Sequence, residues 1–236
     1  MSSRQEEKER RRQERLAQEQ AEARASGRRK RLQLAFGGVL ALALVAGIVL
    51  AVVIGTGGGG SGDGPRQADS TNAAVKLPVQ QIPDIKDAAK TAGCKLTNAA
   101  FEGSNHETKQ FKAADYRTNP PTSGNHAPDW YEDGIYASGD VPDLGKTVHP
   151  LEHGRIIVQY KPGTPEKTVS ELEALLAESE DGYHMMLFEN TTGMTPQVSA
   201  TAWTHSLTCD TMNPKVFDAI RTFRTRYIDK GPENVP

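Results

Sequence analysis

The chain has 236 residues, of which 36% are hydrophobic and 25% are charged, a composition that suits one ordinary domain with appendages and excludes two large domains. The net charge of −2 hides an asymmetry, because residues 1–32 carry eleven Lys/Arg and six Asp/Glu, a balance of +5. The other residues carry seventeen Lys/Arg and twenty-four Asp/Glu, a balance of −7 that argues against nucleic acid as a partner of this larger part.

Residues 34–54 form a run of twenty-one residues without a charge, rich in Leu, Val and Ala. A helix of this length spans about 30 Å, the thickness of the hydrocarbon core of a bilayer. Residues 28–31 are Arg-Arg-Lys-Arg and no comparable basic cluster follows Ile54, so the positive-inside rule predicts a cytoplasmic N-terminus. A cleaved signal peptide is the alternative, but its apolar stretch is usually about 7–15 residues long. We therefore predict an uncleaved, single-pass anchor in the cell membrane.

This anchor divides the chain into four predicted parts. They are a charged cytoplasmic segment (1–33), the transmembrane helix (34–54), a Gly-rich tether (55–82) and an extracytoplasmic domain (83–232). Gly and Ser chains resist ordering, so we expect the tether to be flexible. The predicted partner is the lipid bilayer, through the transmembrane helix. Attraction to anionic lipid explains the basic segment better than the alternative, nucleic-acid binding, so no nucleic-acid partner is predicted.

Local signals predict the secondary structure of the external domain in chain order. Pro83 and Gly93 bound a short helix, and the Pro- and Gly-rich residues 115–150 predict an ordered but mostly irregular loop region. The remaining elements are a strand at 155–160, a helix from Thr164-Pro165 to about 178, a strand at 184–189, a strand at 198–209 that a turn could break, and a helix from Asn213-Pro214 to Tyr227. This β-α-β-β-α order predicts an α+β sandwich with helices on one face of the sheet.

Alternation along the predicted strand at 198–209 places Trp203, His205, Leu207 and Cys209 on the same buried face. Cys94 and Cys209 both fall in the part predicted to be exported, where thiols tend to be oxidised. One intramolecular disulfide is therefore expected, with two separately buried thiols as the alternative. The absence of a C-x-x-C motif excludes thioredoxin-type redox chemistry.

Two boxes carry a resemblance to a known family. Residues 119–126 read Asn-Pro-Pro-Thr-Ser-Gly-Asn-His, and residues 149–154 read His-Pro-Leu-Glu-His-Gly. Together they resemble a family of bacterial membrane-anchored proteins whose exported part is the domain of unknown function 3105. The resemblance extends from about Cys94 to Pro232, and Asn125 stands where many members have Pro. It implies an intact exported domain but no particular reaction.

Histidine placement is the main functional signal. Five of the six histidines lie in or beside the loop-rich region or at a strand start: His106, His126, His149, His153 and His184. Since imidazole is the commonest metal ligand in proteins, we predict a mononuclear metal site made by His126, His149 and His153, with His106 and Met186 as further ligands. Hydrogen bonding of each imidazole to backbone is the alternative.

The nature of the metal depends on which donors join the histidines. Histidine with methionine suits copper, whereas three or four histidines, or histidine with Glu152, suit zinc. His149 and His153 have the spacing of neighbours on a helix, but Pro150 and Gly154 argue against a helix there. We therefore expect both histidines to act from a loop that leads into a strand.

Two other functions remain open from the sequence. The first is a protein-binding or scaffolding domain of the cell envelope, whose recognition surface would hold Trp130, Tyr131, Tyr136 and Trp203. The second is a hydrolase with Ser123 as nucleophile and His126, His153 or Glu152 as acid and base. There is no G-x-S-x-G, P-loop, G-x-G-x-x-G, H-E-x-x-H, EF-hand or haem-attachment motif, so the sequence favours a domain that is not an enzyme.

Overall fold

The structure is a computed structural model that describes residues 75–140, 143–179 and 182–233. The predicted cytoplasmic segment, the predicted transmembrane helix at 34–54 and most of the predicted tether lie outside these residues. Among the residues described, none of the helices has both the length and the apolar character needed to span a bilayer. Apart from the end of the tether, the described residues belong to the predicted external domain.

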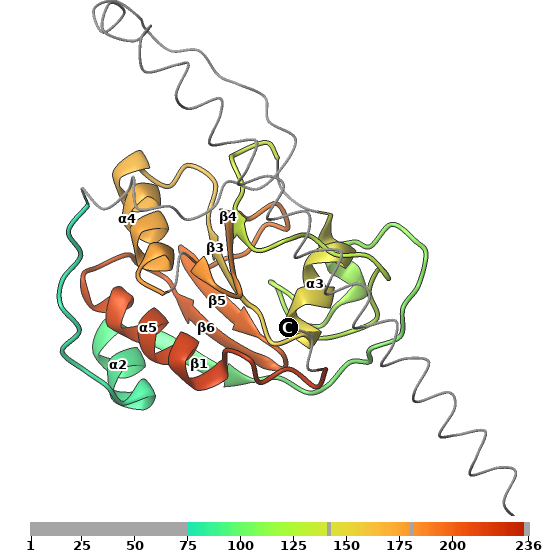
Figure 1. The fold of residues 1–236 in the computed structure, drawn as a ribbon, viewed down its shortest axis with the longest axis horizontal. Helices are drawn as coiled ribbons and strands as arrows, with labels where there is room; N and C mark the ends of the chain where they lie inside the picture. The colour runs from blue at the N-terminus through green and yellow to red at the C-terminus, as the bar shows by residue number, and fades with distance from the viewer. Residues whose placement is uncertain (1–74, 141–142, 180–181, 234–236) are drawn as a thin grey trace, which may run out of the picture. The chain divides into compact units, whose positions relative to one another are not determined.

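A six-stranded mixed sheet organises this part, in the order β1-β6-β5-β3-β4-β2 (Figure 1). Strands β2, β3 and β4 are parallel, and the remaining neighbours pair antiparallel. The strands are β1 (Cys94–Asn98), β2 (Gly134–Ile135), β3 (Ile156–Tyr160), β4 (Met185–Glu189), β5 (Val198–Ala202) and β6 (His205–Cys209). The parallel pair β3 and β4 is connected through a helix, as parallel neighbours require.

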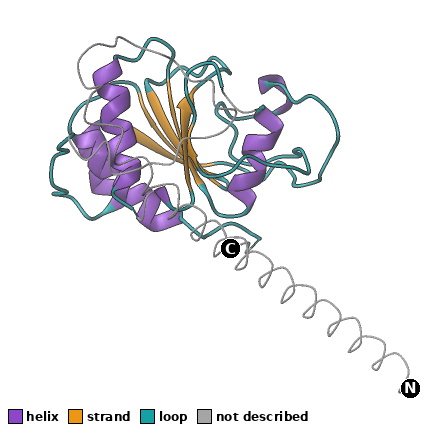
Figure 2. Ribbon diagram, turned by 45° about the horizontal axis from the view of Figure 1, so that its top comes forward, coloured by secondary structure: helices purple, strands orange, loops and turns teal. Residues whose placement is uncertain are grey.

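Three helices cover one face of the sheet: α2 (Ile85–Ala92), α4 (Glu166–Ala177) and α5 (Lys215–Tyr227) (Figures 1 and 2). Alternate residues of the strands, such as Ile156 and Val158, join their apolar side chains in the main core. The helix predicted after Pro83 is α2, which begins where the Asp84 carboxylate accepts the N–H groups of Lys86 and Asp87. It ends at Gly93, whose φ of +72° suits glycine. The α+β class is therefore confirmed.

The opposite face of the sheet packs against α3 (Leu144–Glu152) and the loops around it (Figure 2). Ile157, Met186 and Phe188 point to this side, where they form a second apolar cluster with Leu151 of α3. The prediction that helices lie on one face holds for α2, α4 and α5 but is wrong for α3. The two faces therefore differ in kind, one covered by regular helices and the other by one helix and long loops.

The described residues of 115–150 are mostly irregular, as predicted, but the helix α3 corrects the prediction of a loop around Pro150. Pro150 lies inside the helix, in its last turn, where a residue without an N–H removes only one hydrogen bond. The helical path continues to His153, whose N–H bonds the carbonyl of His149, and stops at Gly154 with a φ of +84°. The same region holds a 3-10 turn, η3 (Ala113–Asp115), and the short strand β2.

The predicted strand at 198–209 is a hairpin of β5 and β6. Trp203 and Thr204 form its turn, and Thr204 has a φ of +61°. Because the turn interrupts the alternation, Trp203 packs with the clusters on the α3 side, whereas Leu207 and Cys209 lie in the main core. The prediction that Trp203 shares a face with Leu207 and Cys209 is therefore wrong.

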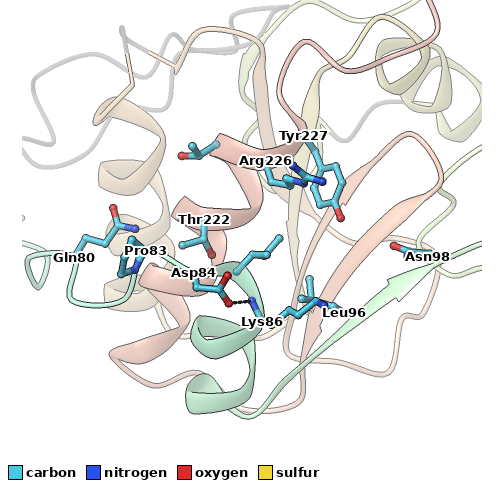
Figure 3. Close-up of a pocket in the computed structure, with 11 residues that line it drawn as sticks. Gln80, Pro83, Asp84, Lys86, Leu96, Asn98, Thr222, Arg226 and Tyr227 are labelled. Carbon is cyan, nitrogen blue, oxygen red and sulfur yellow. Dashed lines mark hydrogen bonds between the residues drawn. The ribbon is translucent and has the colours of Figure 1, made fainter.

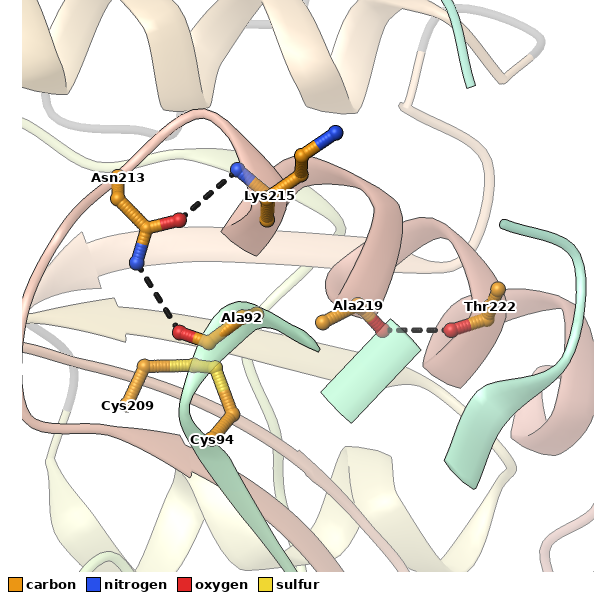
Figure 4. Close-up of a disulfide and its surroundings, with 7 residues drawn as sticks. All are labelled: Ala92, Cys94, Cys209, Asn213, Lys215, Ala219 and Thr222. Carbon is orange, nitrogen blue, oxygen red and sulfur yellow. Dashed lines mark hydrogen bonds between the residues drawn. A yellow bond between two sulfur atoms is a disulfide. The ribbon is translucent and has the colours of Figure 1, made fainter. Parts of the chain in front are cut away.

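Cys94 and Cys209 are direct partners in the register of β1 and β6, and their sulfur atoms lie 1.98 Å apart, the distance of a disulfide (Figure 4). Asn213 lies beside this bond. Its Nδ2 donates to the carbonyl of Ala92 at 3.0 Å, and its Oδ1 accepts the N–H of Lys215 at 3.0 Å. The disulfide and this side chain together connect the end of α2, the edge of the sheet and the start of α5.

Candidate metal centre

Three histidines from distant segments meet on the α3 side of the domain. His106 and His126 are joined by an isolated parallel bridge, in which the N–H of His126 bonds the carbonyl of Asn105 at 3.0 Å and that of Glu107 bonds the carbonyl of His126 at 2.8 Å. The third, His149, projects from α3. One ring nitrogen from each lies within 4.8 Å of the others.

Backbone carbonyls fix the tautomers of the two buried histidines. The Nδ1–H of His126 donates to the carbonyl of Gly124 at 2.8 Å, and that of His149 donates to the carbonyl of Ala127 at 2.8 Å. With the proton on Nδ1, the Nε2 of each ring carries a lone pair. The Nε2 of His126 is buried and has no hydrogen-bond partner. A carbonyl bond of this kind also orients histidines that bind metals.

The tight turn before His126 depends on Gly124. Its φ is +127°, and a Cβ at this position would lie 2.8 Å from the ring of Tyr116. The hydroxyl of Tyr116 donates to the carbonyl of Asn125 at 2.9 Å and so packs the same turn from outside. The Asn-Pro-Pro-Thr-Ser-Gly-Asn-His box therefore serves to hold the His126 ring in place.

His153 follows α3 and extends the cluster. Its Nε2 lies 3.1 Å from the Nε2 of His149. Because that atom of His149 carries a lone pair, His153 donates the proton of this bond, which leaves its own Nδ1 buried without a partner. Burial, together with the neighbouring His149, lowers the pKa of His153 to about 4. The imidazole is therefore neutral near pH 7.

Glu152 brings a carboxylate to the other end of the cluster. Its Oε2 lies 3.1 Å from the Nε2 of His126 and 3.8 Å from the Nε2 of His106, and it forms no hydrogen bond. The side chain is 5% exposed, and burial raises the pKa of Glu152, helped by the charge of Glu233. Burial also lowers the pKa of His126 and of His149, so both are neutral ligand forms at neutral pH.

The cluster reaches the solvent at His106. The side chain of His106 is 43% exposed, whereas His126 and His149 are buried. Trp130, which is 41% exposed, lies beside this opening with its ring centroid 4.9 Å from that of His149 and 5.1 Å from that of His153. Trp203 lies deeper, 6.2 Å from His126. Both tryptophans of the chain therefore lie against the cluster.

The structure brings together His106, His126, His149 and His153 of the predicted ligands but places Met186 elsewhere. Met186 is fully buried in the apolar cluster with Leu151 and Phe188. His184, the one of the five histidines in or beside the loop-rich region that the ligand set omitted, bonds Asp229 through its Nδ1 at 2.6 Å. Copper binding through a thioether thus has no support from the position of Met186.

The residues of the two other predicted functions are also placed. Ser123 is completely buried, and its hydroxyl accepts the N–H of Glu102 at 3.2 Å, which is a structural contact. Tyr136 is buried, with 3% of its surface exposed, and Tyr131 is partly buried against it. Of the predicted recognition surface, Trp130 is the most exposed residue.

Two acidic residues, Glu152 and Glu233, contact the histidine cluster, and little in the sequence indicates either contact. Residues 149–153 read H-x-x-E-H, an order in which a helix presents all three polar side chains on one face, but Pro150 argues against a helix when the sequence is considered alone. Glu233 has no local signal. It reaches His153 at 3.5 Å because the chain after α5 runs along the end of α3, where Asp229 bonds Gly154 and Glu233 bonds Glu152 through their backbones.

A separate hollow lies on the helical side, among α2, β1 and α5 (Figure 3). Asp84 and Lys86 line it from α2, and Arg226 and Tyr227 line it from α5. The sixth histidine, His205, packs against Tyr227 with the two rings tilted and their centroids 4.2 Å apart. This hollow brings together opposite charges that are open to solvent, and it has no part in the histidine cluster.

Comparisons with known proteins agree with the resemblance of the two boxes. A family described as "Protein of unknown function (DUF3105)" matches residues 107–235, which contain His126, α3 and the closing helix α5. Neither the search of the curated proteins nor that of the solved structures found a match. Because the match covers more than half of the chain, this protein belongs to the DUF3105 family.

Proposed function

We propose that the domain binds one divalent transition metal, zinc or copper(II), through His106, His126 and His149. The observation that carries this proposal is the convergence of their ring nitrogens within 4.8 Å. In His126 and His149, the hydrogen bond from Nδ1–H to a backbone carbonyl leaves the lone pair on Nε2, which faces away from that carbonyl. The Nε2 of His126 has no hydrogen-bond partner. Imidazole nitrogens in this tautomer are the ligand form that zinc and copper(II) take.

The physical chemistry of the cluster favours a cation over an internal hydrogen-bond network. A buried acceptor without a donor costs about 1–3 kcal/mol, and the cluster contains several: the Nε2 of His126, the Nδ1 of His153 and the Oε2 of Glu152. A metal ion bound by the three histidines would satisfy the lone pair of His126, which has no hydrogen-bond partner. The buried carboxylate of Glu152 supplies negative charge beside it. The donor set is nitrogen and oxygen, which suits zinc and copper(II) better than copper(I).

Metal analysis of the full-length chain, purified in mild detergent without a metal-binding tag, tests the proposal. We expect about one equivalent of zinc or copper after reconstitution and dialysis, and its loss in His126→Ala and in His149→Ala. The matched controls are His205→Ala, a histidine outside the cluster, and Met186→Leu, which removes the one predicted sulfur ligand. Both should keep the metal. A wild-type chain that binds none, or controls that lose it equally, would refute the site.

Fluorescence gives an independent reading. The chain has two tryptophans, and both Trp130 and Trp203 lie within a few ångströms of the cluster rings. Copper(II) bound there should therefore quench most of the tryptophan emission with a one-to-one end point. Quenching that is equally strong in His126→Ala would mean that copper binds elsewhere.

We also propose that this domain lies outside the cytoplasm, attached through the segment 34–54. The uncharged run and the basic residues before it support this, and a disulfide is common in exported domains and rare in cytosolic ones. Protease added to intact spheroplasts tests it. We expect digestion of the domain, and survival of the domain until the cells are lysed would contradict the orientation.

A further inference from the structure

We propose that the metal centre activates a water molecule for the hydrolysis of uncharged esters or amides, with Glu152 as the base that takes the proton from that water. This inference rests on the metal site proposed above and adds a reaction to it. The observation behind it is a buried carboxylate whose Oε2 has no hydrogen bond and lies 3.1 and 3.8 Å from the Nε2 atoms of His126 and His106.

Three protein ligands leave room for water on the metal. Structural zinc sites are closed by four protein ligands, whereas catalytic sites have three and keep one position for water or substrate. The group that converges within 4.8 Å consists of three histidines, and Glu152 is not part of it. Solvent can reach this group, because His106 is 43% exposed. The centre therefore has the ligand number and the access of a catalytic site.

Glu152 lies where it can hold such a water. It is the residue next to His153 and three residues after His149, so the helical path turns its side chain to the face that carries the cluster. Its nearest neighbours in the cluster are His126 and the exposed ligand His106. Zinc hydrolases with a helical H-x-x-E-H segment combine histidine ligands with a glutamate in this order.

The reaction needs no reagent other than water. Glu152 accepts one proton from the metal-bound water, and the resulting hydroxide forms a C–O bond to the carbonyl carbon of the substrate. The bond between this carbon and the leaving alkoxide or amine then breaks. The leaving group takes the proton from Glu152, which returns to the carboxylate, and the products are a carboxylic acid and an alcohol or amine.

The surroundings indicate the charge of the substrate. Glu152 and Glu233 place two carboxylates at the cluster, which offset the charge of a divalent metal ion and leave no net positive charge to attract an anionic substrate. Trp130 offers an exposed aromatic ring beside the opening at His106. An uncharged ester or amide with an apolar group suits this combination better than a phosphate ester.

Hydrolysis of p-nitrophenyl acetate by the zinc-loaded full-length chain tests the proposal. We expect kcat/KM well above that of the metal-free chain, and a decrease of about 100-fold or more in Glu152→Gln, since a general base typically contributes about 10²–10⁴-fold. Glu132→Gln, a change of the same kind at an exposed carboxylate, is the matched control and should leave kcat/KM unchanged. Glu152→Gln should still bind one equivalent of zinc at saturating metal, because Glu152 is not among the three converging ligand residues.

The outcomes separate this inference from the metal site. If the wild-type chain binds no metal, the proposed function fails and the inference with it. If zinc binds but hydrolysis does not exceed that of the metal-free chain, or Glu152→Gln remains as active as wild type, the inference alone fails. A loss of zinc binding in Glu152→Gln would make Glu152 a fourth ligand and would also overturn its role as base.

A second reading does not depend on turnover. Cobalt(II) in place of zinc gives visible absorption bands that respond to the coordination sphere. Azide should shift these bands in wild type and in Glu152→Gln, because it would replace the water in the open position. Bands that do not respond to azide in wild type would show a closed coordination sphere and would refute the proposal.

Discussion

Removal of the disulfide between Cys94 and Cys209 should destabilise the domain strongly. The two cysteines are 115 residues apart, and a cross-link that closes a loop of this length reduces the entropy of the unfolded chain by an amount worth about 4.8 kcal/mol at 25 °C. The closed loop runs from β1 to β6 and so contains all four histidines of the cluster. We therefore expect the double variant Cys94→Ala/Cys209→Ala to lose about 4–5 kcal/mol of unfolding free energy.

Urea unfolding of the full-length chain, followed by tryptophan emission, measures this loss. At a slope of about 2 kcal/mol per M urea, the midpoint should fall by roughly 2 M. Wild type in dithiothreitol should show the same decrease, whereas the double variant should not respond to dithiothreitol. This comparison separates the cross-link from the packing of the Cys209 side chain, which is buried in the main core. A decrease of less than about 1 kcal/mol on reduction would refute the loop-closure reasoning.

Three further predictions concern the cluster and the core. In metal-free protein the pKa of folded His153 is about 4, below its unfolded value, so unfolding takes up a proton in this pH range. The free energy of unfolding should therefore fall as the pH drops from about 6.5 to 4. Urea unfolding at several pH values measures this, and His153→Gln should show a weaker dependence on pH. Gly124→Ala should weaken zinc binding at least about tenfold in a competition titration, because a φ of +127° strains alanine at the turn that orients His126. Asp218→Ala should lower thermal stability by about 3–5 kcal/mol, since it leaves the buried Arg221 with one partner fewer.

The helical face of the sheet could be predicted because each of its elements carries a local signal. The helix α2 has a capping aspartate and a glycine at its end, and β3 is a short apolar run of β-branched residues. The predicted bounds of β3, α4, β4 and α5 agree with the structure to within about two residues. The edge strands β1 and β2 were not predicted, because both are short and depend on their partners for pairing.

The α3 side was harder to predict because tertiary contacts decide its structure. Pro150 argued against a helix, yet the cost of one missing hydrogen bond in a last turn is small beside the burial of Val148 and Leu151. The wrong assignment of this helix concealed the order H-x-x-E-H, whose meaning depends on a helical path. In the same way, the turn at Trp203 reversed the side on which that residue packs.

The sequence predicted which types of residue form the candidate site, but not how they are arranged in space. His126, His149 and His153 were expected to act together, and their boxes were recognisable. The place of His106 depends on a single bridge to His126, and that of Glu233 depends on backbone bonds between the end of the chain and α3. Contacts of this kind follow from the complete fold, so no spacing in the sequence reveals them.

The helical face of the sheet carries the main core, and the α3 side carries the histidine cluster. The main core and the disulfide lie with α2 and α5, and they hold the sheet independently of the histidines. The loops that carry His106 and His126 have less regular structure and meet α3 through the histidines, through the bond from Ala127 to Gly145, and through a small apolar cluster of loop residues with Val148 of α3. A metal at this point would cross-link three segments that lie outside the main core. Its binding free energy should therefore stabilise the site against local opening more than it raises the stability of the sheet.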